Sequence, residues 1–234
     1  MNRISEISEN LTVVREQIDR AAGAAERNTT SIKLIVVTKN FPVSDVQILY
    51  DLGIREFGEN RDQEGALKSA QLPGDINWHF QGQIQSRKIR SIASWARVVH
   101  SLDSLDHARK FDATDQPATK SENTVSDYFV QINLEPSRRD RGGVIVAEVE
   151  SFMHTLFSET QIAPSGLMTV APLNMSPVEA FGQLRELRAG FMGSYPSLSQ
   201  LSMGMSGDFE AAISCGATHI RVGSSILGSR GLPV

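Results

Sequence analysis

The residue with the clearest chemical potential is a lysine at the end of a short apolar run. Lys39 follows the β-rich segment 32-IKLIVVT-38 and precedes a turn that contains Pro42. Side chains alternate between the two faces of a strand, so Ile35, Val37 and Lys39 share one face. An inward, partly desolvated lysine is the kind that forms an imine with a carbonyl compound, whereas a solvated lysine at this position has no such role. The choice between the two depends on what faces Lys39.

A serine between two glycines near the end of the sequence suggests a ligand-binding turn. In 202-SMGMSGDFEAAI-213, Gly204 and Gly207 allow a tight turn from a strand into a helix, and Ser206 is placed to cap that helix. In 221-RVGSSILG-228, a second such turn, the missing side chain of Gly223 opens backbone N–H groups to a ligand. The two turns together indicate a seat for a phosphate.

The elements that must position these residues alternate along the chain. Strand-like runs lie at 32–40, 54–57, 76–80, 97–100, 127–133, 165–169, 199–204 and 218–223. Helical patterns lie between them at 43–52, 59–70, 83–94, 104–113, 142–158, 177–190 and 207–215. An amphipathic helix precedes the first strand, with the apolar stripe Ile4, Ile7, Leu11, Val14 and Ile18. Eight alternating strand–helix units predict an α/β fold, a single (β/α)8 TIM-type barrel with an extra N-terminal helix.

The main alternative is an open, doubly wound sheet. That fold favours a glycine-rich fingerprint after its first strand, and 38-TKNFP-42 carries none. The polar stretch 114–127 is short enough to be a surface loop, so we expect residues 1–234 to form one domain.

The barrel would bring the chemical residues together at one end. Active sites of such barrels lie at the carboxyl ends of the strands, and the loops after strands seven and eight commonly hold a phosphate. The first strand neighbours the eighth once the barrel closes. Alternation also directs His79 and Arg221 into the barrel. Lys39 and the phosphate seat therefore suit one ligand with an aldehyde and a phosphate, such as pyridoxal 5′-phosphate (PLP).

Composition excludes several partners. The chain has 234 residues, a net charge of −4 and 40% hydrophobic residues, with no long basic run. Neither nucleic acid nor an anionic membrane is therefore an expected partner. Cys215 is the only cysteine, which rules out an internal disulfide and favours a reducing, cytoplasmic location. No His, Cys, Asp or Glu spacing suggests a metal site.

Several segments resemble the pyridoxal phosphate homeostasis protein family, whose members are related to the alanine racemase N-terminal barrel. The matching segments are 36-VVTKNFP-42, 57-FGEN-60, 78-WHFQGQIQSRK-88, 100-HSLDS-104, 166-GLM-168, 201-LSMGMSGDFEAAI-213 and 218-THIRVGSSILG-228. The resemblance implies a covalent Schiff base between PLP and Lys39, and it places Arg221 beside the pyridine nitrogen. It assigns the phosphate to Ser206, Gly223 and Ser224, and the pocket walls to Asn60, His79 and Met203. The arginine-rich loop 135-EPSRRDRGG-143 departs from the family pattern, so no role is carried over for it.

Three functions remain open on this sequence. A two-base racemase needs a second acid or base across from the lysine. In the racemases that the chain resembles, this group is a tyrosine from a C-terminal domain of a partner subunit, and we expect no such domain here because the sequence ends soon after Arg221. Tyr50, Tyr128 and Tyr195 are not at predicted strand ends.

We therefore expect a non-catalytic, monomeric PLP carrier that serves PLP homeostasis and delivers the cofactor to apo PLP-dependent enzymes. The alternative is a PLP-dependent amino-acid racemase of low activity. A third possibility is a barrel enzyme that acts on a phosphorylated sugar with Lys39 as an aldolase-type residue.

Overall fold

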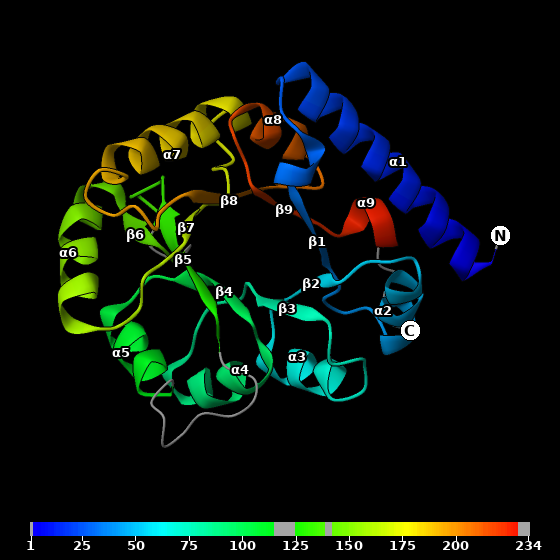
Figure 1. Cartoon of the computed structure of the whole chain (residues 1–234), viewed down its shortest axis with the longest axis horizontal. Helices are drawn as coiled ribbons and strands as arrows, with labels where there is room; N and C mark the ends of the chain where they lie inside the picture. Colours follow the sequence, from blue (N-terminus) through cyan, green and yellow to red (C-terminus); the bar gives the residue numbers. More distant parts are fainter. Residues whose placement is uncertain (1, 115–124, 139–141, 229–234) are drawn as a thin grey trace.

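The computed structural model describes residues 2–114, 125–138 and 142–228. Parallel strands form the inner ring of a closed barrel, and helices surround it (Figure 1). The barrel strands are β1 (Lys33–Val37), β2 (Glu56–Glu59), β3 (Asn77–Phe80), β4 (Val98–Leu102), β5 (Asp127–Asn133), β7 (Gly166–Met168), β8 (Gln200–Met205) and β9 (His219–Val222). Pairing of β1 with β9 and of β4 with β5 closes the ring, which confirms the predicted (β/α)8 barrel.

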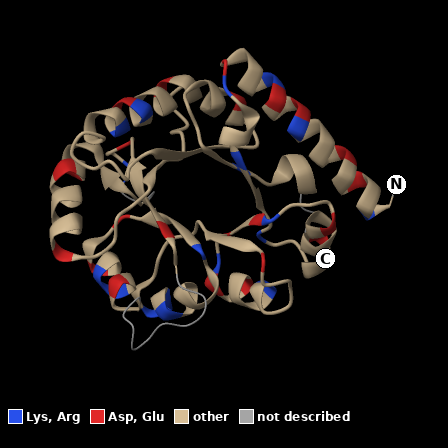
Figure 2. Cartoon of the chain, in the orientation of Figure 1, with Lys and Arg blue, Asp and Glu red and all other residues tan. Residues whose placement is uncertain are grey.

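Helices follow the strands around the outside of the ring. They are α2 (Val43–Asp51), α3 (Asp62–Ser69), α4 (Ile89–Trp95), α5 (Leu105–Thr114), α6 (Val149–Glu159), α7 (Pro177–Phe191), α8 (Phe209–Ser214) and the short α9 (Ser224–Leu227). Positions of basic and of acidic residues both occur along several of these outer helices (Figure 2). In the described part of the chain, none of the helices is long and apolar enough to cross a membrane.

Two predicted helices begin well after the position that the sequence pattern suggested. The helix predicted over 83–94 begins at Ile89, after a 3-10 turn over Ser86–Lys88. The helix predicted over 142–158 begins at Val149, because Gly142 and Gly143 take positive φ values of 64° and 104° that an α-helix excludes. The residues that follow these glycines form a short extra strand, β6 (Val144–Ile145), which pairs with the end of β5.

The N-terminal helix α1 (Arg3–Ala24) braces the last helix of the barrel. Ile7, Leu11, Val14 and Ile18 are all buried, as the apolar stripe predicted, whereas Ile4 is 56% exposed. Arg3 Nη2 donates to the carbonyl of Leu227 at 3.0 Å, and Asn10 Nδ2 donates to the carbonyl of Ile226 at 3.0 Å. Helix α1 therefore holds α9, whose start forms part of the site described below (Figure 1).

The two faces of the barrel strands have different surroundings. The outward side chains, such as Phe57, Trp78 and Ile220, pack into one apolar core beneath the helices. The inward side chains are more polar and include His79, His100, Ser202, His219 and Arg221, all buried. Polar groups inside a barrel need partners, because an unpaired buried polar group is costly.

Candidate functional site

The larger of two neighbouring pockets opens at the carboxyl ends of the barrel strands. Its volume is about 630 Å³. Six of the eight residues singled out from the sequence line it: Lys39, Asn60, Ser206, Arg221, Gly223 and Ser224. These residues come from the ends of β1, β2, β8 and β9 and from the start of α9, so barrel closure brings together residues separated by up to 185 positions (224 − 39).

Ser206 binds the turn at the start of α9. Its hydroxyl oxygen accepts the backbone N–H of Gly223 at 3.2 Å and that of Ser225 at 3.4 Å. The proposed cap on the following helix was wrong: Asp208 stands at the N-cap of α8 and Ser206 does not. The two glycine- and serine-rich turns are thus joined to each other, and Ser206, Gly223 and Ser224 lie together in the lining of the pocket.

The backbone of Gly223 lies close to the backbone of Val37. A Cβ atom there would lie 3.0 Å from the carbonyl oxygen of Val37, on the strand that leads to Lys39. Any larger residue would have to displace this neighbour or the turn itself. A phosphate fits this seat, because Ser206, Ser224 and the backbone of Gly223 line it and no carboxylate is among the described lining residues.

Arg221 lies on the pocket floor, where two buried acceptors fix its guanidinium. Nη1 donates to the hydroxyl of Ser202 at 2.7 Å, and Nη2 donates to the carbonyl of Thr169 at 2.9 Å. Burial lowers the pKa of Arg221 to about 10, so the side chain stays positively charged at neutral pH. The prediction that Arg221 points into the barrel is confirmed.

Behind Arg221, a chain of hydrogen bonds runs through the barrel interior. Ser202 Oγ lies 2.8 Å from His100 Nδ1, His100 Nε2 lies 2.8 Å from His79 Nδ1, and His79 Nε2 lies 2.6 Å from Glu56 Oε2. A guanidinium only donates hydrogen bonds, so the Ser202 hydroxyl accepts one from Arg221 and donates its own O–H to His100. With both rings neutral, His100 then donates to His79, and His79 donates to Glu56.

The electrostatic environment keeps these rings neutral. Burial lowers the pKa of His100 well below its usual value, and it also lowers the pKa of His79 in spite of the neighbouring Glu56. For Glu56, burial opposes ionisation, but the bonds from His79 and Asn77 and the charge of Lys33 outweigh it and lower the pKa to about 2. Among the described residues, no three His, Cys, Asp or Glu side chains are grouped to hold a metal ion.

A third interior histidine predicts a pH dependence of stability. Burial lowers the pKa of His219 to about 3, whereas an unfolded histidine titrates near 6.5. Below pH 6.5, His219 therefore binds a proton in the unfolded chain but not in the folded protein, and the free energy of unfolding falls. The contribution of His219 is about 1.4 kcal/mol per pH unit, or about 2 kcal/mol between pH 6.5 and 5.

Urea unfolding at pH 7.5, 6.5 and 5 measures this contribution as the difference between the wild type and His219→Gln. Glu59 and Asp127, whose pKa values burial raises, act in the opposite direction in both proteins and cancel in the comparison. His154, exposed on α6, supplies the control variant His154→Gln, which should keep the wild-type slope. A His219→Gln protein that loses stability as steeply as the wild type would refute the assignment.

His79 and Met203 lie outside the described lining of the pocket. His79 is fully buried within the interior chain just described, and Met203 is fully buried in the outer apolar core. Met205 lines the pocket instead, because β8 has an irregular register: Ser202 pairs with His219 but Met205 pairs with Arg221. Three steps on β8 thus match two on β9, and this bulge turns Met205 inward.

Gly204 makes this bulge possible, and its replacement should destabilise the barrel. Its φ is +94°, and a Cβ atom would lie 2.6 Å from Ala212 Cβ and 2.9 Å from Phe209 Cα. Gly204→Ala should cost about 2–4 kcal/mol of unfolding free energy, from backbone strain and overpacking. Gly207→Ala is the matched control, because a Cβ atom there meets nothing within 4 Å. Denaturant unfolding of both variants is the measurement, and equal losses would contradict the explanation.

Several pocket residues received no ligand-binding role from the sequence. They are Val37, Phe41, Gln81, Met168, Val170, Met205, Gly207 and Gly228. Gln81 extends the inward alternation of β3, and its buried Nε2 has no hydrogen-bond partner among the described residues. Strand alternation was the signal that could have identified Gln81, whereas the loop residues Phe41 and Val170 carry no periodic signal.

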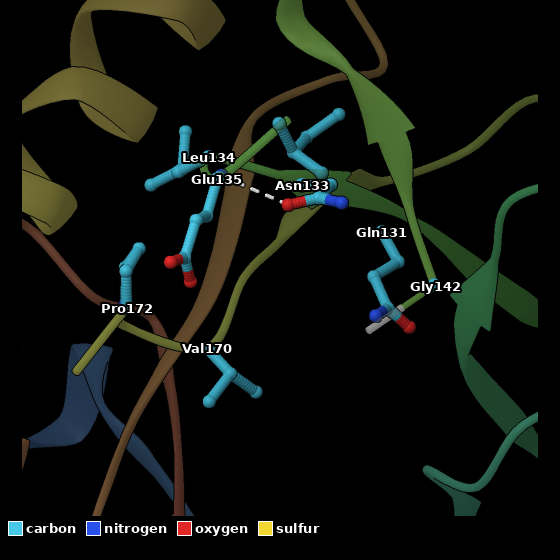
Figure 3. A pocket seen from close by; sticks show the side chains of 8 residues that line it. Gln131, Asn133, Leu134, Glu135, Gly142, Val170 and Pro172 are labelled. Atoms are coloured by element: carbon cyan, nitrogen blue, oxygen red, sulfur yellow. Dashed lines mark hydrogen bonds between the residues drawn. The ribbon is translucent and has the colours of Figure 1, made fainter. Parts of the chain in front are cut away.

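A smaller pocket of about 290 Å³ adjoins the first and shares Val170 with it (Figure 3). Its walls include Gln131, Asn133 and Glu135, and the Asn133 side chain accepts the Glu135 N–H at 2.8 Å. Gly142, from the arginine-rich loop, also lines it. Residues 139–141 of that loop lie outside the described residues, as do residues 115–124 of the predicted surface loop.

Comparison with known proteins places this barrel in a family. The model of the alanine racemase N-terminal domain matches residues 9–231. The chain is 38% identical over 224 residues to the pyridoxal phosphate homeostasis protein of Corynebacterium glutamicum, covering 94% of this chain and all of the relative. It is 32% identical over 234 residues to the protein of the same name from Escherichia coli, covering 97% and 98% of the two chains.

Solved structures agree with this assignment. PipY of Synechococcus elongatus, solved with PLP bound, is 34% identical, with a TM-score of 0.76 over 91% of this chain and all of that one. Alanine racemase from Corynebacterium glutamicum is only 16% identical but shares the fold, with a TM-score of 0.71 over 99% of this chain and 64% of the racemase. The chain therefore belongs to the pyridoxal phosphate homeostasis protein family, a branch of the proteins built on the alanine racemase N-terminal barrel.

Proposed function

We propose that this protein binds PLP in the larger pocket, holds it as a Schiff base on Lys39 and serves intracellular PLP homeostasis without catalytic turnover. The observation that carries the proposal is the pairing of Lys39 with the Ser206–Gly223 seat on one pocket of about 630 Å³. When bound, PLP supplies an aldehyde that condenses with amines and an aromatic ring that withdraws electrons. The PLP-bound structure of the related PipY supports the choice of ligand.

The residues of the pocket would divide the binding between them. Ser206, Ser224 and the N–H groups around Gly223 would hold the phosphate. Arg221, already fixed by Ser202 and Thr169, would face the ring nitrogen and disfavour its protonation, because like charges repel. A ring that stays unprotonated is a poorer electron sink, which favours storage over carbanion chemistry.

The composition of the pocket supports the non-catalytic reading. The described lining residues include no histidine, carboxylate, tyrosine or cysteine, so none of them supplies the second acid or base of a racemase. The three tyrosines are engaged elsewhere: Tyr50 donates to Asp75, Tyr195 stacks on Phe157, and Tyr128 packs against Phe111.

The proposal extends to how the protein works in the cell. Residues 1–234 would act as one PLP-binding domain, and the protein would act as a monomer. A cytoplasmic location suits the buried free thiol of Cys215. Apo PLP-dependent enzymes would be the recipients of the cofactor.

A transfer assay tests the proposal. PLP-loaded protein mixed with an apo PLP-dependent enzyme should restore that enzyme's activity, while the loaded protein alone should not racemise a panel of amino acids. Racemase or transaminase turnover that disappears in Lys39→Ala would overturn the carrier in favour of the enzyme. Binding of a phosphorylated sugar in place of PLP, with no absorption near the visible, would favour the aldolase-type alternative.

A further inference from the structure

The turn that carries Lys39 has an unusual backbone. The N–H of Phe41 donates to the carbonyl of Thr38 at 3.0 Å, which closes a turn with Lys39 and Asn40 at its centre. Asn40 has a φ of +64°, in the left-handed region that asparagine tolerates better than most residues. The position of the Lys39 amine therefore depends on what holds this turn.

Helix α3 holds the turn from both sides of Lys39. Lys68 Nζ donates to the carbonyl of Thr38 at 2.7 Å, and Glu64 Oε1 accepts the N–H of Asn40 at 2.6 Å. Lys68 and Glu64 also pair with each other at 2.8 Å, one helical turn apart. The residues before and after Lys39 are thus bound to one side-chain pair on a neighbouring helix.

This pair rests on a buried carboxylate. Lys68 Nζ lies 2.6 Å from Glu59 Oε1, and Thr38 Oγ1 donates to the same oxygen at 2.6 Å. Glu59 is fully buried and Lys68 is 2% exposed. Burial raises the pKa of Glu59, although Lys68 and Thr38 counteract it.

The same contacts keep Lys68 from reacting in place of Lys39. An ammonium group has three N–H donors, and Thr38, Glu59 and Glu64 provide three acceptors for them. A lysine must reach the carbonyl carbon before it forms an imine. The buried Lys68 lies outside the described lining of the pocket, whereas Lys39 lines it.

We propose that Glu64 and Lys68 are positioning residues, which fix the backbone on both sides of Lys39 so that its amine meets the aldehyde of a phosphate-anchored ligand. This role rests on the proposed function, because it concerns the covalent step at Lys39, in which the amine nitrogen bonds to the aldehyde carbon and the aldehyde oxygen leaves as water. Neither residue lines the pocket in the described structure, so each acts through the turn and not by touching the ligand. Fixing a reacting amine lowers the entropic cost of the reaction, and a displacement of about 1 Å costs about a hundredfold in rate.

Three variants of helix α3 separate positioning from folding. Glu64→Ala removes the acceptor for the Asn40 N–H, while Glu64→Gln keeps an amide oxygen in its place without the charge. Gln63→Ala, at the exposed neighbouring position, controls for changes to the helix itself. Each protein is titrated with PLP and with 4′-deoxypyridoxine 5′-phosphate, which has the phosphate and ring but no aldehyde.

The expected result is selective. In Glu64→Ala, stopped-flow absorbance should show covalent attachment of PLP slowed about tenfold to a hundredfold, with the affinity for the deoxy analogue unchanged. Glu64→Gln and Gln63→Ala should react at nearly the wild-type rate. Attachment at the wild-type rate in Glu64→Ala, or equal weakening of both ligands, would overturn the positioning role.

The outcomes also separate this inference from the proposed function. If the wild type forms no borohydride-stable adduct at Lys39, the proposed function fails and the positioning role falls with it. If the wild type forms the adduct and Glu64→Ala forms it equally fast, only the positioning role fails. Lys68→Met is a second variant that should slow attachment; because it leaves Glu59 buried without a cation, it is interpreted only if its circular dichroism matches the wild type.

Discussion

Lys39→Ala is expected to abolish the borohydride-stable adduct between PLP and the protein completely. The lysine is the one pocket-lining residue in the described structure with an amine, and it follows β1, which pairs with β9, the strand that leads into the proposed phosphate seat. The variant should lose the absorption of the protein-bound imine but should still bind PLP non-covalently, since Ser206 and Gly223 are untouched. Mass spectrometry of peptides after borohydride reduction gives the site directly.

Two other lysines serve as controls for this experiment. Lys33 lies at the opposite end of β1, where it pairs with Glu56 at 3.5 Å, and Lys88 pairs with Asp62 at 3.1 Å. Lys33→Ala and Lys88→Ala should therefore keep the adduct. Reduced cofactor on either of these lysines in the wild-type protein would show that the assignment of Lys39 is wrong.

The phosphate is expected to account for much of the affinity, so pyridoxal should bind at least about a hundredfold more weakly than PLP. The phosphate carries about −1.5 to −2 charges at pH 7. Hydrogen bonds to charged groups contribute about 1.5–3 kcal/mol each, so loss of two of them costs about 3–6 kcal/mol, or about 10² to 10⁴ in affinity. Calorimetric or absorbance titration with both ligands measures this difference.

A substitution at Gly223 tests where the phosphate lies. Gly223→Val should reduce PLP affinity toward that of pyridoxal, because even a Cβ atom would lie 3.0 Å from the carbonyl of Val37. Gly182→Val, on helix α7, is the control, since a Cβ atom there meets nothing within 4 Å. Equal affinities of the wild type for pyridoxal and PLP would exclude the seat between the two turns.

Much of the fold and of the site could be predicted from local sequence patterns. The alternation of short β-rich runs with helical runs predicted the eight barrel strands, and the apolar stripe predicted α1. Strand alternation placed Arg221 and His79 inside the barrel, and the known position of barrel active sites linked Lys39 with Gly223. These inferences succeed because side-chain direction in a strand has a period of two, which the sequence displays directly.

Strand periodicity and local turn chemistry gave the wrong surroundings for three residues, Met203, His79 and Ser206. Met203 follows the period of β8, but the bulge at Gly204 interrupts that period and turns Met205 into the pocket. His79 does point inward, yet its depth is set by partners on β2 and β4, which hold it below the pocket floor. Ser206 has a residue type and position that suit a helix cap. In the folded protein, however, its hydroxyl oxygen accepts two N–H groups from the start of α9.

Local sequence patterns were enough to predict the barrel, the lysine and the glycine-rich turns, because periodicity and turn chemistry act between near neighbours. Which of these residues share a pocket, and which groups bind the turn around Lys39, became known from the folded structure. Lys68 reads in the sequence as one more helix lysine, whereas in the fold it is 2% exposed and bound to Thr38, Glu59 and Glu64. Contacts of that kind form between side chains on different strands and helices, and no local pattern records them, because their geometry exists only after the barrel has closed.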